Sequence, residues 1–238
     1  MPLRTAEQQA RIHLVLLLAL TFTTGIADAV GYLGLDYVFT ANMTGNVVIL
    51  GMALVGGQPP GGGGHALPVI GPLIALFAFM LGAALAGRRL HRAPAGWTGR
   101  TTTMFLVTGL GILVLGLACA VEPPVSATVW GYAVTAGLAL LMGIQAATAR
   151  RLAVADVTTV VVTSTLTGLA ADSRLAGGKG TRWVRRVLAV VLILAGATVG
   201  AAILHGGLAA GLIVPGVIVT AVAVIGHFSA HSGRPLGE

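Results

Sequence analysis

The placement of the positively charged side chains constrains this chain more than any other feature. Lys and Arg together number 14, and they separate long apolar stretches. Short loops rich in Lys and Arg stay on the cytoplasmic side of a membrane. With six membrane-spanning helices and both chain ends in the cytoplasm, all of them fall on that side. They lie before the first helix (Arg4, Arg11), in a first loop (Arg88, Arg89, Arg92, Arg100), after the fourth helix (Arg150, Arg151), in a second loop (Arg174, Lys179, Arg182, Arg185, Arg186) and in the tail (Arg234).

The composition indicates a polytopic membrane protein of the all-α class. Hydrophobic residues make up 56% of the chain and charged residues 9%, and the mean hydropathy is +0.93. A soluble domain of this length would lack the polar surface that keeps it dissolved. The net charge of +7 would suggest nucleic acid in a soluble protein, but these basic residues lie beside apolar runs, where they contact anionic lipid headgroups. We therefore expect the lipid bilayer, and no nucleic acid, as a partner.

Six apolar stretches are long enough to cross a hydrocarbon core of about 30 Å. Two further stretches, 38–57 and 157–171, are apolar but rich in Thr, Asn and Ser. If both of them crossed, the loops that hold six of the basic residues would lie on the outer face, which the positive-inside rule disfavours. We expect interrupted segments that enter and leave on one side, the first from outside and the second from inside. The six predicted spans are 12–34, 66–87, 101–121, 127–149, 184–205 and 208–228.

An internal repeat relates a first half, 1–121, to a second half, 127–238. Three short matches recur 118 or 119 residues apart. Because the first helices of the two halves run in opposite directions across the membrane, the repeat is predicted to be inverted, an arrangement common in secondary transporters. The matches pair Gly25-Ile26 with Gly143-Ile144, Thr40-x-x-x-Thr44-Gly45 with Thr159-x-x-x-Thr163-Ser164, and Gly82-Ala83-Ala84-Leu85 with Gly200-Ala201-Ala202-Ile203.

Asp28 is the acidic residue that lies deepest within an apolar run. A carboxylate at the centre of a bilayer costs at least about 2.5–3.5 kcal/mol, so it is expected to face the protein interior and to be paired or protonated. One interpretation makes Asp28 a proton-coupling or cation-binding group. The other makes it a polar contact between helices near the outer interface.

The densest polar cluster at membrane depth is Asn42, Thr44, Gly45 and Asn46. A break at Gly45, followed by a helix from about Asn46, would point free backbone N–H groups and the positive end of the helix dipole at the membrane centre. Two such helix ends facing each other would bind a polar or anionic group. The alternative is that the hydroxyl groups bond to their own helix and the small residues allow close packing. The mirrored break is expected at Thr163-Ser164, next to Thr165, with Thr159 before it.

Other polar residues belong to the paired first helices of the two halves. Gln145 follows Gly143 closely, and Thr23, Thr24 and Tyr32 flank Asp28. By the repeat they would line the same cavity, although each alone is more often a contact between helices. The sequence has no Cys/His cluster, no paired-carboxylate motif and no phosphate loop, and Cys119 is its single cysteine. We therefore expect no metal, no cofactor and no enzymatic activity.

The motif Gly25-x-x-Asp28-Ala29, followed by Phe39-x-x-x-x-Thr44-Gly45-Asn46, resembles the YoaK-like family of bacterial inner-membrane proteins. Gly143-Ile144-Gln145 with Arg150-Arg151-Leu152 and Asp156-Val157-x-Thr159 also looks like that family, so the resemblance covers most of the chain. Ser164 stands where the family pattern leads us to expect Gly. The resemblance implies six spans, a location in the bacterial inner membrane and a role in small-molecule transport, with the substrate open.

These observations predict a membrane transporter of a small polar or anionic solute, with its site at the midplane between the two interrupted segments. Asp28 would couple a proton or cation to transport. A passive channel is the alternative within transport, and a partner or structural subunit, or an intramembrane enzyme, are alternatives from other classes. Small-residue faces such as Gly109 to Gly111 and Gly116 leave open whether helices pack within one chain or in a homo-oligomer. The expected substrate-binding residues are Asn42, Thr44, Gly45, Asn46, Thr159, Thr163, Ser164, Thr165 and Gln145.

Overall fold

The structure is a computed structural model that describes residues 6–56, 67–94, 96–125, 127–152, 162–173, 176–178 and 183–231. Over these ranges the regular secondary structure is helical throughout. Six helices are long and apolar enough to cross a membrane, which confirms the predicted class of a polytopic all-α membrane protein. They are α1 (Ala6–Gly34), α3 (Ile70–Leu90), α4 (Gly99–Val121), α5 (Val129–Arg151), α7 (Trp183–Leu204) and α8 (Leu208–His231).

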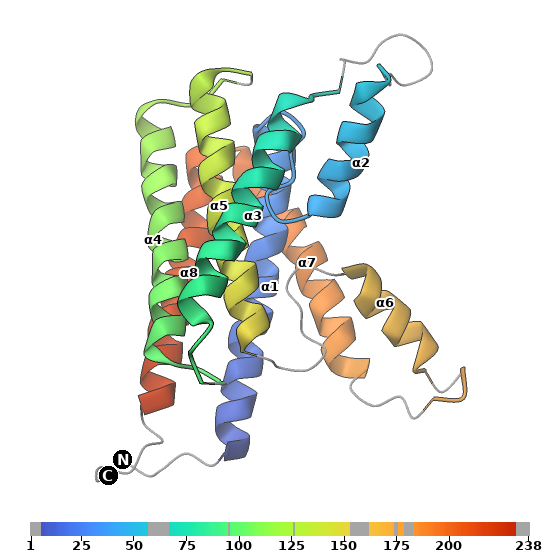
Figure 1. Cartoon of the computed structure of the whole chain (residues 1–238), viewed down its shortest axis with the longest axis vertical. Coiled ribbons are helices and arrows are strands. Elements are labelled where there is room, and N and C mark those ends of the chain that lie inside the picture. The colour runs from blue at the N-terminus through green and yellow to red at the C-terminus, as the bar shows by residue number, and fades with distance from the viewer. Residues whose placement is uncertain are drawn as a thin grey trace.

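The two polar stretches form short helices, α2 (Met43–Leu54) and α6 (Val162–Ala171). With 12 and 10 residues, they are about 18 and 15 Å long at 1.5 Å per residue, which is too short for a hydrocarbon core. Figure 1 shows both on the same side of the bundle, α2 in its upper half and α6 in its lower half. Between them they cover roughly the depth that one long helix spans.

Consecutive long helices alternate in direction, so that α1 begins and α8 ends at the same end of the bundle (Figure 1). That end also holds the loop between α3 and α4, the last turn of α5 and the first turn of α7. All the basic residues that the structure describes lie there, at Arg11, Arg88, Arg89, Arg92, Arg100, Arg150, Arg151, Arg185 and Arg186. We call it the basic end.

The helices pack in a pattern that is unchanged when α1, α2, α3 and α4 are exchanged in order with α5, α6, α7 and α8. The α1–α7 contact becomes α5–α3, the α1–α8 contact becomes α5–α4, and α2–α3 becomes α6–α7. The α3–α4 contact becomes α7–α8, while α4–α8 and α1–α5 map onto themselves. Every packed pair of helices in the described part of the chain therefore has a counterpart under this exchange.

Close backbone contacts at glycine follow the same exchange. A methyl group at Gly25 of α1 would collide with the carbonyl oxygen of Ile193 on α7, and one at Gly143 of α5 would collide with that of Phe79 on α3. These two crossings need glycine because the neighbouring backbone occupies the space of a Cβ atom. The carbonyl groups of Phe79 and Ile193 thus hold equivalent positions against the paired first helices.

The reciprocal contacts correct one predicted match. Gly82 packs against the Leu140 carbonyl and Gly196 against the Phe22 carbonyl, so Gly82 corresponds to Gly196 rather than to Gly200. The sequence match was one helical turn out of register. A packing face recurs about every 3.6 residues, and a helix rich in Gly and Ala offers similar matches on successive turns.

Three glycines of α4 pack against other helices of the chain. Gly109 and Gly116 lie against Thr220 and Ile213 of α8, while Gly111 lies against Leu141 of α5. Cys119 is buried on the same helix. These glycines therefore pack helices within one chain.

Candidate functional site

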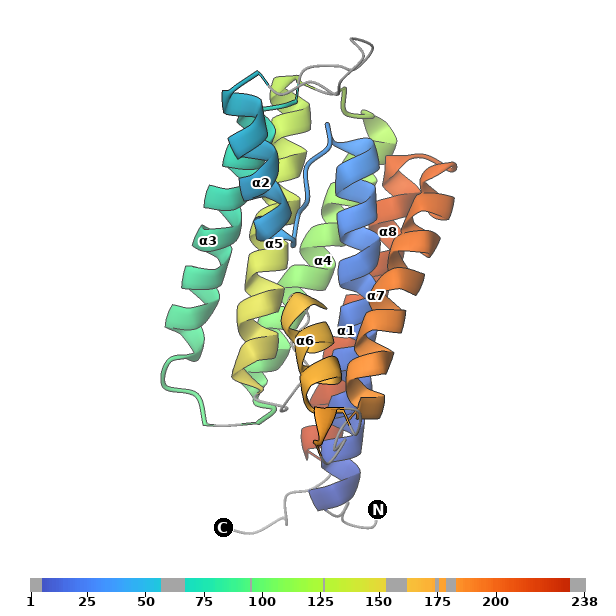
Figure 2. The ribbon, with the colours of Figure 1, turned by 90° about the vertical axis from the view of Figure 1, so that its right-hand side faces the viewer.

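A cavity of about 800 Å³ lies beside the two short helices, where α1, α3 and α7 form the rest of its wall. Figure 2 shows α2 and α6 in front of the long helices, with the start of α6 below α2. First-turn residues of both short helices line the cavity, as expected for two interrupted segments that approach one site. The lining residues are Thr24, Asp28, Tyr32, Phe39, Ala41, Asn42, Met43, Thr44, Gly45, Val48, Ile49, Phe79, Val162, Thr163 and Ile193.

Asp28 holds the non-helical segment that precedes α2. Its Oδ1 atom accepts hydrogen bonds from the backbone N–H groups of Thr40, Ala41 and Asn42, at 3.0, 2.7 and 3.3 Å. The Thr40 hydroxyl adds a bond to the Ala27 carbonyl at 3.2 Å. Amides outside a helix or sheet need partners when they are buried, and the carboxylate supplies an acceptor to the buried residues Thr40 and Ala41 and to the exposed Asn42. Asp28 thereby fixes where α2 begins relative to α1.

Asn46 of α2 also binds the backbone of this segment. Its Nδ2 donates to the Phe39 carbonyl at 2.6 Å, and its Oδ1 accepts from the Phe39 N–H at 2.9 Å. The side chain is buried and does not line the cavity. The structure therefore places Asn46 in the support of the segment, whereas the sequence placed it among the substrate ligands.

The start of α2 also differs from the expectation. The helix begins at Met43, and the Asn42 side chain caps it by accepting from the Gly45 N–H at 3.2 Å. The predicted break at Gly45 is wrong, because an Asn cap replaces a glycine break and starts the helix about one turn earlier. Thr44 and Gly45 remain on the cavity wall as members of the first turn.

In the second half, Thr163 lines the cavity, whereas Ser164 and Thr165 do not. All three lie inside α6, so the predicted break at Thr163-Ser164 is wrong as well. Thr159 lies outside the described residues.

Arg186 of α7 anchors α6 by donating to the Gly168 carbonyl and to Asp172 Oδ2, the latter at 2.7 Å.

Gln145 lies behind the cavity wall rather than on it. From α5 its Nε2 donates to Thr24 Oγ1 at 3.2 Å and to the Leu20 carbonyl at 3.5 Å, both on α1. The side chain is 1% exposed, and its Oε1 has no hydrogen-bond partner among the described residues. Gln145 thus connects the paired first helices, and Thr24 is the member of this contact that reaches the cavity.

Among the aromatic residues that line the cavity, Tyr32 was expected there from the sequence, whereas Phe39 and Phe79 were not. Tyr32 stacks on Phe39 with ring centroids 4.8 Å apart, and Phe79 reaches the cavity from α3. Ile193 does so from α7. Apolar residues in a membrane helix look alike whether they face lipid or a cavity, and the packing of the helices decides between the two.

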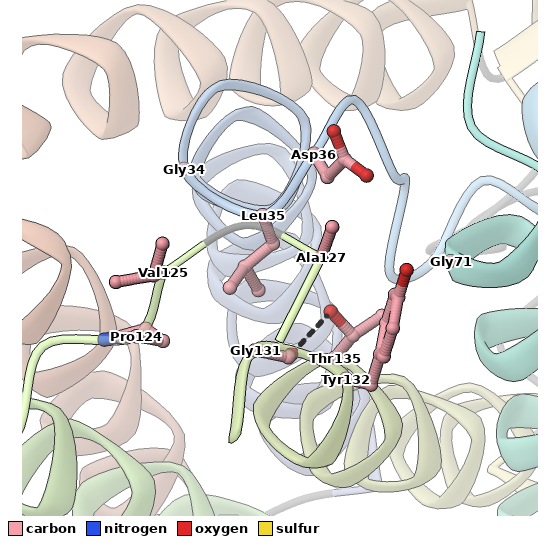
Figure 3. Close-up of a pocket in the computed structure, with 10 residues that line it drawn as sticks. All are labelled: Gly34, Leu35, Asp36, Gly71, Pro124, Val125, Ala127, Gly131, Tyr132 and Thr135. Atoms are coloured by element: carbon pink, nitrogen blue, oxygen red, sulfur yellow. Dashed lines mark hydrogen bonds between the residues drawn. The ribbon is translucent and has the colours of Figure 1, made fainter. Parts of the chain in front are cut away.

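A much smaller pocket lies at the end of the bundle opposite the basic end. Figure 3 shows it between the end of α1, the loop before α5 and the first turns of α5, with Asp36 and Tyr132 among its residues. The Thr135 hydroxyl there donates to the Gly131 carbonyl at 3.0 Å. The volume is about 10 Å³, which is close to the space that one water molecule needs. This pocket is too small for a solute.

The fold and the cavity define a polytopic all-α membrane protein with an open cavity beside two short helices. Residues 16–225 match the model of a family described as a protein of unknown function, DUF1275. The chain is also 32% identical over 192 residues to the UPF0700 transmembrane protein YoaK of Bacillus subtilis (strain 168), which covers 77% of this chain and 80% of that protein. The chain belongs to this family of membrane proteins. No solved structure matches it.

Proposed function

We propose that the chain is a membrane transporter that binds a small solute in the cavity beside α2 and α6. The observation that carries this proposal is that both short helices contribute first-turn residues to one cavity of about 800 Å³. That volume lies within the range of pockets that hold small ligands. Non-helical backbone at membrane depth is tolerated where it lines such a cavity, which suits the segment before α2.

The membrane arrangement proposed with this function is an inverted repeat. The packing of α1, α2, α3 and α4 maps onto that of α5, α6, α7 and α8, and corresponding long helices run in opposite directions. With the basic end in the cytoplasm, α2 belongs to a segment that enters from outside and α6 to one that enters from inside. Both chain termini are then cytoplasmic, and the resemblance to bacterial proteins argues for the inner membrane.

The contacts of Asp28 bear on the charge of the solute. Three backbone N–H groups of the segment before α2, which an anion in the cavity could otherwise use, already donate to the Asp28 carboxylate. Of the polar and anionic solutes expected from the sequence, the lining therefore favours those without negative charge. Proton coupling through Asp28 remains part of the proposal, with passive conduction as the alternative.

Flux through proteoliposomes tests the proposal even though the solute is unidentified. Vesicles that contain the protein are loaded with the small-molecule extract of bacterial cells and incubated in buffer. Mass spectrometry identifies the compounds that leave them faster than they leave equally loaded liposomes without protein. Thr163→Trp, which places a bulky side chain at the cavity, should abolish the selective efflux. Val114→Trp is the matched control, because Val114 is 64% exposed on the outer face of α4.

Selective efflux that saturates and that Thr163→Trp abolishes supports a carrier. Selective efflux that does not saturate supports a channel through the same cavity. If no compound leaves faster than it leaves loaded liposomes without protein, or if the two tryptophan variants behave alike, the cavity is not a transport site.

A further inference from the structure

The charge of the cavity is unbalanced. Among the described residues that line it, Asp28 is the one with a formal charge, and none is Lys, Arg or His. The arginines that the structure describes lie at the basic end of the bundle. A solute that enters the cavity therefore meets one carboxylate and no side-chain cation of the described lining to compensate it.

The two oxygen atoms of Asp28 have different surroundings. Oδ1 accepts all three backbone N–H bonds, while Oδ2 accepts no hydrogen bond from any residue that the structure describes. Hydrogen bonds from amides to one oxygen fix the orientation of the carboxylate. The second oxygen remains available as an acceptor at the cavity wall.

The rest of the wall suits an apolar body attached to a positive charge. The stacked rings of Tyr32 and Phe39 lie at the cavity close in sequence and space to the Asp28 network. Aromatic faces attract organic cations within about 6 Å of the ring centroid. Phe79, Ile49 and Ile193 add apolar surface, and a cavity of about 800 Å³ is far larger than a bare metal ion or ammonium ion needs.

We propose that this cavity binds an organic monocation with an apolar body, its positive group against Asp28 Oδ2 and its body against Tyr32, Phe39 and Phe79. This inference gives the substrate class for the transport function proposed above and rests on the same cavity. It concerns binding, so that it can fail or hold independently of transport.

A series of three compounds of similar size tests the charge. Phenethylammonium, 2-phenylethanol and 3-phenylpropionate share a phenylethyl body and carry a positive, a neutral and a negative end. Binding to the purified full-length protein in an uncharged detergent is measured by isothermal titration calorimetry, with empty micelles as the blank for partitioning. We expect phenethylammonium to bind at least ten-fold more tightly than either analogue, and tetramethylammonium to bind more weakly because it lacks the body.

Two variants and one control locate the binding. Asp28→Asn keeps an acceptor for the three amides and removes the charge, so the cation should lose ten-fold or more in affinity while the alcohol is unaffected. Tyr32→Leu leaves the Asp28 network intact and should weaken the cation several-fold, which provides a test if Asp28→Asn does not fold. Asp36→Asn is the control, because it removes the same charge from a residue outside the cavity, and it should change nothing.

Tighter binding of the propionate, or equal binding of all three compounds, would overturn the inference. So would an Asp28→Asn variant that binds the cation as the unmodified protein does, or one that loses the cation and the alcohol alike. Cation binding that depends on Asp28, without flux in proteoliposomes, would retain the substrate class and refute the transport function.

Discussion

The Asp28 carboxylate on α1 lies 2.7 Å from the backbone nitrogen of Ala41, thirteen residues further along the chain. This contact and its two neighbours join a membrane-depth acidic residue to the segment that leads into α2. The same carboxylate thus supports the backbone with one oxygen and presents the other to the cavity. Its structural and proposed binding roles can be separated by substitution.

Removal of the side-chain acceptor at position 28 should destabilise the protein. Asp28→Ala leaves the amides of Thr40, Ala41 and Asn42 without their partner. Thr40 and Ala41 are buried, and an unsatisfied buried group costs about 1–3 kcal/mol, so we expect a loss of about 2–4 kcal/mol of unfolding free energy. Asp28→Asn should recover at least half of that loss. The measurement is thermal unfolding in detergent, and equal melting temperatures for the Ala and Asn variants would contradict the support role.

Asn46 should matter for stability more than for selectivity. Asn46→Ala removes both bonds to the Phe39 backbone, and we expect a cost of about 2 kcal/mol. Val47→Ala is the matched control, because Val47 follows directly on the same helix and is 53% exposed. If instead Asn46→Ala melts like the control but fails to bind solute, Asn46 is a ligand, as the sequence alone suggested.

The glycines at the two helix crossings should not tolerate a methyl group. Gly25→Ala and Gly143→Ala place Cβ against the carbonyl groups of Ile193 and Phe79, and such overpacking costs about 1–3 kcal/mol. Gly51→Ala on α2 is the control, because a Cβ atom at position 51 would have no neighbouring atom within 4 Å. Both crossing variants should melt at lower temperature than Gly51→Ala. Unchanged melting of either one would show that its helices do not cross at backbone contact.

The orientation in the membrane can be mapped with single cysteines in a Cys119→Ala background. Val55→Cys, at the end of α2, should react with a membrane-impermeant maleimide in intact cells. Arg92→Cys and Ala171→Cys should react only after the membrane is permeabilised. Reaction of Arg92→Cys from outside would place the basic end outside and reverse the proposed topology.

Much of the fold could be predicted from the sequence because long apolar stretches and the distribution of arginine are strong signals. The six long helices and the two short ones follow from them, with ends that shift by a few residues. The roles of Asp28 and Asn46 could not be assigned in the same way. Both residues occur in the motif that resembles the family, but a hydrogen bond between Asp28 and Ala41 depends on how the chain reverses after α1, which spacing alone does not fix.

The cavity wall shows the same limit. The residues expected at the site that do line the cavity are Asn42, Thr44, Gly45 and Thr163, while Asn46, Gln145, Ser164 and Thr165 lie elsewhere. Phe79 and Ile193 were not expected there. They reach the cavity because their backbones cross Gly143 and Gly25 closely, a consequence of packing between helices that are distant in sequence. Only the packing of the two halves against each other places Phe79 and Ile193 at one cavity.

The accessibility of the cavity to water tests the account most directly. Single cysteines at Thr44, Thr163 and Val114, in the Cys119→Ala background, are treated with a water-soluble methanethiosulfonate reagent in membranes, and the reaction rates are compared. Thr44→Cys and Thr163→Cys should react readily, because both line the cavity, whereas Val114→Cys on the outer face of α4 should not. If Thr44→Cys and Thr163→Cys are as protected as Val114→Cys, no aqueous site lies between the short helices, and the proposed transport function falls.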